Sequence, residues 1–132
     1  VEAFPKWQMW QNDDFNTWMY SPLEETRANV LSTGYPEDKF VFVKGKVEDT
    51  IPDQVPDSIA ILRIDTDWYA STYHQLVHLF PLLSPGGVLI IDDYGSWKGC
   101  REACDRYFKE TNSAMLLHRV DDTARIAMKP GA

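Results

Sequence analysis

Two short apolar runs, each followed at once by acidic residues, constrain this chain more than any other feature. Residues 59–64 (IAILRI) lead directly into Asp-Thr-Asp at 65–67, and residues 88–91 (VLII) lead into Asp-Asp at 92–93. Continuous apolar runs of this length are typical of strands buried on both faces of a parallel sheet. The pattern therefore predicts two parallel strands with carboxylates at their C-terminal ends.

Helical and strand-like segments alternate along the rest of the chain. Besides those two strands, we expect a strand at 40–44, helices at 21–32, 71–83 and 99–111, and closing strands at 115–120 and 124–128 around an Asp121-Asp122 turn. The helix at 21–32 is expected to begin with Ser21 as its N-cap. Such alternation predicts an α/β fold, a doubly wound sheet with helices on both faces.

The acidic residues at the two strand ends predict a metal site. Neighbouring parallel strands run about 4.8 Å apart and end at the same edge of the sheet, so Asp65, Asp92 and Asp93 can converge on one ion. Carboxylate oxygens without a neighbouring His or Cys favour Mg²⁺, with Mn²⁺ or Ca²⁺ as alternatives. The competing interpretation is that these acids only cap the helices that follow.

Six segments between residues 21 and 95 resemble one known family. They are 21–29 (SPLEETRAN), 42–45 (FVKG), 48–52 (EDTIP), 62–69 (LRIDTDWY), 83–87 (LSPGG) and 91–95 (IDDYG). Together they are similar to the macrocin O-methyltransferase (TylF-type) family, whose fold is the Rossmann-like sheet of class I S-adenosylmethionine-dependent methyltransferases. The resemblance implies an O-methyltransferase that transfers a methyl group from S-adenosylmethionine to a hydroxyl of a small molecule, such as a sugar or other natural product.

The resemblance also assigns roles to individual residues. It implies that Asp65, Asp92 and Asp93 are metal ligands and that Asp67 is the general base that takes the proton from the acceptor hydroxyl. It further implies cofactor contacts at Asp65 and in the loop that carries Lys46, Val47 and Glu48. That loop has a second interpretation as an ordinary turn between a strand and a helix.

The start of the sequence departs from the family pattern. Residues 1–5 resemble the sequence that follows the second strand of the family's sheet, so we expect a chain that lacks the first two strands. Residues 1–20 then form an irregular, Trp-rich segment, a lid or a substrate-facing loop, and residues 21–132 form the C-terminal portion of the methyltransferase domain. The strand at 40–44 would lose both usual neighbours, which predicts a homo-oligomer or a rearranged sheet.

Charge and hydropathy exclude several other classes of protein. The net charge is −7 and no Lys/Arg cluster forms the basic surface that nucleic acids require. No apolar run approaches the roughly 20 residues of a membrane span, and no signal-peptide pattern is present, so a cytoplasmic protein is expected. Cys100 and Cys104 are expected to be inert thiols on one helix face. His74 and His78 are expected to lie on a helix face without a metal.

Two other functions compete with the methyltransferase. The same acid cluster would suit a metal-dependent phosphoester hydrolase, and a fragment of this fold would self-associate without any activity. The Gly86-Gly87 pair before the second apolar run favours the methyltransferase.

Overall fold

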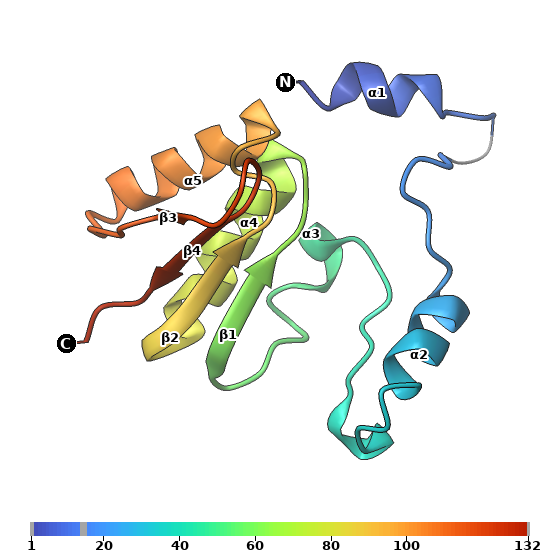
Figure 1. Ribbon diagram of the computed structural model, residues 1–132, viewed down its shortest axis with the longest axis horizontal. Helices are drawn as coiled ribbons and strands as arrows, with labels where there is room; N and C mark the ends of the chain where they lie inside the picture. Colours follow the sequence, from blue (N-terminus) through green and yellow to red (C-terminus); the bar gives the residue numbers. More distant parts are fainter. Residues whose placement is uncertain (1, 14–15, 132) are drawn as a thin grey trace.

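The computed structural model describes residues 2–13 and 16–131. A four-stranded sheet carries the aspartates that follow residues 59–64 and 88–91. The sheet has the order β1-β2-β4-β3 (Figure 1). Its strands are β1 (Ile59–Ile64), β2 (Leu83–Ile91), β3 (His118–Arg119) and β4 (Arg125–Met128). β1 and β2 are parallel, and β4 pairs antiparallel with both β2 and β3. The predicted parallel pair and the closing strands are confirmed, although β3 is shorter than expected.

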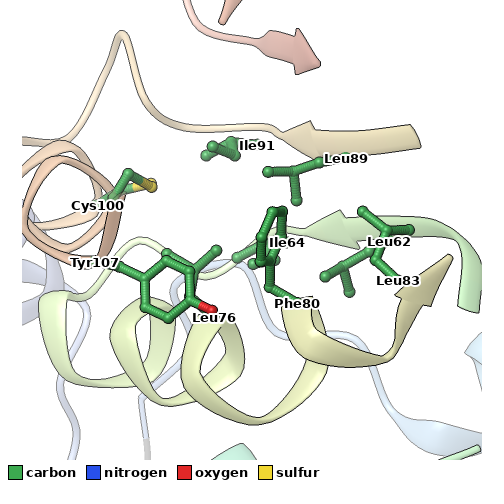
Figure 2. Packing of buried hydrophobic residues seen from close by; sticks show 10 residues of the cluster. Leu62, Ile64, Leu76, Phe80, Leu83, Leu89, Ile91, Cys100 and Tyr107 are labelled. Carbon is green, nitrogen blue, oxygen red and sulfur yellow. The ribbon is translucent and has the colours of Figure 1, made fainter. Parts of the chain in front are cut away.

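Two helices cover one face of this sheet. They are α4 (Tyr69–Leu79), which continues into the 3₁₀ turn η2 (Phe80–Leu82), and α5 (Lys98–Glu110). Side chains alternate along a strand, so Leu62 and Ile64 of β1 and Leu89 of β2 point to the helices, where each is at most 5% exposed. They pack against Leu76 and the other buried residues of α4, η2 and α5 (Figure 2).

The opposite face of the sheet is open in the described residues. Ile61 of β1 is 66% exposed and Met128 of β4 is 68% exposed. The α/β sheet is confirmed, but α4 and α5 lie on the same face, which differs from the expectation of helices on both faces. In the order of the sheet, β4 lies between β2 and β3, so the sheet does not follow the order of the chain at this edge.

The expected strand at 40–44 was wrong. Residues 41–44 have no regular secondary structure, and Val41 is 88% exposed. An apolar run becomes a strand only when a neighbouring strand takes up its backbone N–H and C=O groups. Among the described residues, β1 pairs only with β2, and no strand pairs with 40–44.

The N-terminal part of the chain contains three short helices without a buried residue. In the described residues they are α1 (Phe4–Met9), α2 (Leu23–Leu31) and α3 (Val47–Thr50), and the 3₁₀ turn η1 (Glu37–Lys39) lies between α2 and α3. α1 lies within the segment expected to be irregular, where Val1, Asp14 and Phe15 are outside the described residues, as is Ala132 at the other end. α2 begins one residue later than predicted, because Pro22 and not Ser21 is its N-cap. Figure 1 shows α2 lying apart from the sheet.

In the described part of the chain, no helix is both long and apolar enough to cross a membrane.

Candidate metal and acceptor site

The carboxylates after β1 and β2 meet at one edge of the sheet. Ile64 pairs with Ile91 in the parallel ladder, and the Asp92 backbone N–H donates to the Ile64 carbonyl at 3.0 Å, which extends the pairing by one step. As a result, carboxylate oxygens of Asp65, Asp92 and Asp93 all lie within 4.8 Å of one another. Three oxygen ligands at this separation fit a hard divalent cation.

Buried polar side chains fix the turn that carries Asp65 and Asp67. The Thr72 hydroxyl donates to the Thr66 carbonyl at 2.6 Å, and the Gln75 amide donates to the Thr66 hydroxyl at 2.8 Å. Thr72 is fully buried and Gln75 is 7% exposed, so both hydrogen bonds are shielded from water. The start of α4 therefore holds the turn after β1 in one conformation.

Asp67 and Asp93 face each other across the two strand ends. Burial is the main cause that raises the pKa of Asp93 to about 7, and the charge of Asp67 adds to it. Burial also raises the pKa of Asp67, although hydrogen bonds from Asp93 and from the Trp97 side chain oppose this shift. Two half-buried carboxyls in contact disfavour a second negative charge, so the pair retains a proton to a higher pH than free carboxyls do.

Arg63 lies beside the cluster and contacts two of its members. Its Nη2 atom is 2.8 Å from Asp65 Oδ2 and 2.8 Å from Asp92 Oδ1. The hydrogen bond to Asp92 and the charge of Asp65 raise the pKa of the guanidinium, which stays protonated. The sequence pattern gave no reason to include Arg63 in the site, because it occupies a position within the strand.

Trp18 of the N-terminal segment and Trp97 at the start of α5 line one cavity with the carboxylates. A cavity of about 270 Å³ is lined by the four aspartates together with Lys6, Trp18, Met19 and Trp97. Trp18 and Trp97 meet edge to face with ring centroids 5.7 Å apart, and Lys6 Nζ lies 5.2 Å from the Trp97 ring centre. The sequence predicted a Trp-rich lid or substrate-facing loop that includes Trp18, but it gave no sign of Lys6 or of the contact with Trp97, because these contacts join segments far apart in the chain.

The predicted cofactor loop lies away from that cavity. Lys46 is the N-cap of α3, and Val47 and Glu48 form its first turn. The carboxyl of Glu48 interacts with Ser71 and His74 of α4, and a backbone hydrogen bond is the main cause that lowers its pKa. Of the four residues expected to contact the cofactor, the structure therefore brings only Asp65 into the carboxylate cluster.

The two cysteines lie on α5 and the two histidines lie on α4. Cys100 and Cys104 are buried free thiols in the core under the sheet. The ring of His74 lies 4.5 Å from that of His78, and its Nε2 atom is 2.9 Å from the Ile51 carbonyl oxygen. The metal-type cluster among the described residues consists of aspartates alone.

Three curated proteins are similar to this chain in sequence. The 8-demethyl-8-(2,3-dimethoxy-α-L-rhamnosyl)-tetracenomycin-C 4'-O-methyltransferase of Streptomyces olivaceus is 43% identical over 77% of the chain. Demethyldecarbamoylnovobiocin O-methyltransferase of Streptomyces niveus is 36% identical over 74%, and mycinamicin III 3''-O-methyltransferase of Micromonospora griseorubida is 40% identical over 64%. The aligned part amounts to 39%, 37% and 33% of those proteins, so the chain spans well under half their length.

A solved structure and a family model agree with this similarity. The structure of the O-methyltransferase NovP matches 88% of the chain with a TM-score of 0.83 and 31% identity, and the match covers 48% of NovP. The calicheamicin enzyme CalS11, a TDP-rhamnose 3'-O-methyltransferase, matches at 22% identity with a TM-score of 0.57, which supports the fold alone. The family model for macrocin-O-methyltransferase (TylF) matches residues 2–129. The chain therefore belongs to the macrocin-O-methyltransferase (TylF) family.

Proposed function

We propose that this chain is the metal-carrying portion of an O-methyltransferase that uses S-adenosylmethionine to methylate a sugar hydroxyl. The observation that carries the proposal is the cavity in which Asp67 lies beside Asp65, Asp92 and Asp93. The names of the similar proteins describe methylation of rhamnosyl, novobiocin and mycinamicin compounds, which supports a sugar-bearing natural product as the acceptor.

The four aspartates divide into two roles in this proposal. Asp65, Asp92 and Asp93 hold a divalent cation, Mg²⁺ in the first instance, with Mn²⁺ or Ca²⁺ as substitutes. The ion supplies Lewis acidity toward the acceptor hydroxyl. Asp67 shares the cavity but is not one of the three clustered ligands, so its carboxylate is available to accept the hydroxyl proton. Its raised pKa makes it a stronger base than an exposed aspartate.

The cofactor contacts remain a proposal from the family resemblance. S-adenosylmethionine supplies an electrophilic methyl group when it is bound. Asp65 and the exposed turn of Lys46, Val47 and Glu48 would hold it, since carboxylates and backbone groups in such a turn can bond hydroxyl and amino groups. The lowered pKa of Glu48 keeps its side chain an acceptor of hydrogen bonds at neutral pH.

The Trp-rich segment would contact the acceptor. Trp18 and Trp97 present aromatic surface to the same cavity as the carboxylates. The C–H face of a sugar ring packs on aromatic rings, while its hydroxyls reach the acidic groups below. In this arrangement residues 1–20 act as a substrate-facing cover for the site.

Metal binding and methyl transfer test the proposal together. Mn²⁺ is titrated calorimetrically into the chain and into the Asp92→Asn variant, with Asp57→Asn as a control because Asp57 is exposed in a loop. Methyl transfer from S-adenosylmethionine to TDP-rhamnose is then followed by mass spectrometry, with CalS11, a TDP-rhamnose 3'-O-methyltransferase, as a reference enzyme. Loss of Mn²⁺ binding in Asp92→Asn alone, with a methylated product, supports the proposal.

The same assays distinguish the two competing functions. If the chain hydrolysed a generic phosphoester with Mg²⁺ and no methyl donor, its function would be that of a hydrolase and not of a methyltransferase. A chain that binds neither Mn²⁺ nor S-adenosylhomocysteine would be a fragment without enzymatic function. If S-adenosylhomocysteine bound only to a longer chain that adds the two N-terminal strands expected for the family, the cofactor site would be formed by those strands together with this chain.

Self-association is a further part of the proposal. The edge of β1 and the open face of the sheet both leave apolar residues accessible, and Ile61 and Met128 are each more than half exposed. Unpaired strand edges and apolar faces favour pairing with a second copy. Sedimentation velocity should find a dimer or larger species, and a concentration-independent monomer would exclude it.

A further inference from the structure

Arg63 is placed by β1 at the point where the two acidic strand ends meet. Its neighbours Leu62 and Ile64 are buried against the helices, so the alternation of the strand turns Arg63 to the opposite face. In the ladder it pairs with Ile90, one step before the strand end at Ile91. From there its guanidinium reaches forward to the carboxylates that follow both strands.

The guanidinium joins two of the three proposed metal ligands. A single nitrogen, Nη2, lies 2.8 Å from Asp65 Oδ2 and 2.8 Å from Asp92 Oδ1. It donates a hydrogen bond to Asp92 and forms an ion pair with Asp65. Each carboxylate keeps its second oxygen, which remains available to an ion. Arg63 thus ties the ligand after β1 to the ligand after β2.

We propose that Arg63 is a positioning residue for the metal site and that it increases metal affinity although it carries a positive charge. This inference rests on the proposed function, because it takes Asp65, Asp92 and Asp93 as the metal ligands. Without the bridge, the half-exposed Asp65 side chain would be free to rotate away from Asp92. Residues that orient ligands in this way typically contribute 10- to 100-fold in metal affinity.

The sign of one substitution separates positioning from simple charge. If Arg63 acted only as a nearby cation, its repulsion would oppose a divalent ion, and removing it would tighten metal binding. If it positions the ligands, removing it weakens binding despite the lost repulsion. Arg63→Met removes both the charge and the donors while keeping a chain of similar bulk.

The experiment measures the Mn²⁺ dissociation constant by calorimetry for the whole chain and three variants. We expect Arg63→Met to bind Mn²⁺ about tenfold or more weakly. Arg63→Gln, which is uncharged and too short to bridge both carboxylates, should also bind more weakly and serves as a second test if Arg63→Met fails to fold. The control is Arg119→Met, which changes the net charge equally on β3 and should leave binding unchanged. Circular dichroism checks the fold of each variant.

Each outcome has a definite meaning. Unchanged or tighter Mn²⁺ binding in a folded Arg63→Met or Arg63→Gln variant would overturn the positioning role while leaving the metal site intact. Equal weakening in Arg119→Met would show that losing an arginine weakens binding without acting at the site, and it would also overturn the positioning role. If the unmodified chain bound no Mn²⁺, the metal site of the proposed function would itself fail, and this inference with it.

Discussion

Asp67 and Asp93, which follow different strands, are joined by a side-chain hydrogen bond in the half-buried floor of the cavity. A hydrogen bond between two carboxyl groups requires a proton on one of them. The general base of the proposed reaction and one of the proposed metal ligands are therefore linked in their protonation.

The stability of the metal-free chain should fall as the pH rises from about 4 to about 7. Burial raises the pKa of Asp93 to about 7, whereas an unfolded aspartate titrates near 3.9. Between these values the folded state binds more protons than the unfolded state, so the free energy of unfolding decreases with rising pH. Thermal melts in EDTA across this range measure the effect. Asp93→Asn should flatten the curve, and a variant curve parallel to that of the unmodified chain would contradict the assignment.

Replacing Trp97 by Phe should raise the pKa of Asp67 further. The Trp97 side chain donates a hydrogen bond that stabilises the Asp67 carboxylate, and Phe keeps an aromatic ring without the N–H donor. Carboxyl ¹³C NMR titration of the metal-free chain measures the change. Trp10→Phe is the matched control, because Trp10 ends α1 and is 53% exposed. An unchanged Asp67 titration in Trp97→Phe would show that this hydrogen bond is not formed in solution.

Gly95→Ala should destabilise the fold by roughly 1–3 kcal/mol. A Cβ atom at Gly95 would lie 1.9 Å from the carbonyl oxygen of Asp122, which is backbone and cannot rotate away. The turn after Asp93 would then have to move off the turn between β3 and β4. Chemical denaturation compares this variant with Gly131→Ala, where an added Cβ meets no heavy atom within 4 Å. Equal stabilities of the two variants would contradict the close packing of these turns.

Leu76→Ala should cost roughly 2–5 kcal/mol of unfolding free energy. Leu76 is fully buried between α4 and the sheet, so its removal leaves a cavity in the core (Figure 2). Leu116→Ala is the matched control, because Leu116 is 72% exposed and its loss should change stability little. Urea denaturation of both variants gives the comparison. A similar loss in both would mean that the core under the sheet is not formed as described.

The strand ends could be predicted from the sequence because the signals for them are local. Residues 59–64 and 88–91 are continuous apolar runs, and each is followed directly by its aspartates, so parallel pairing was enough to bring Asp65, Asp92 and Asp93 together. The residues at 40–44 carry an equally apolar pattern but form no strand. Their pattern could not reveal whether a neighbouring strand would be there to bond their backbone groups.

The sequence by itself determined the parallel strands β1 and β2, the helices that follow them, and the carboxylates at one sheet edge. Only the tertiary structure decided that Trp18 and Lys6 line the same cavity, and that Arg63 bridges Asp65 and Asp92. The physical reason is the separation along the chain of the residues that each feature involves. Side-chain periodicity and strand ends depend on neighbouring residues, whereas these contacts depend on how distant segments pack, which leaves no regular pattern along the chain.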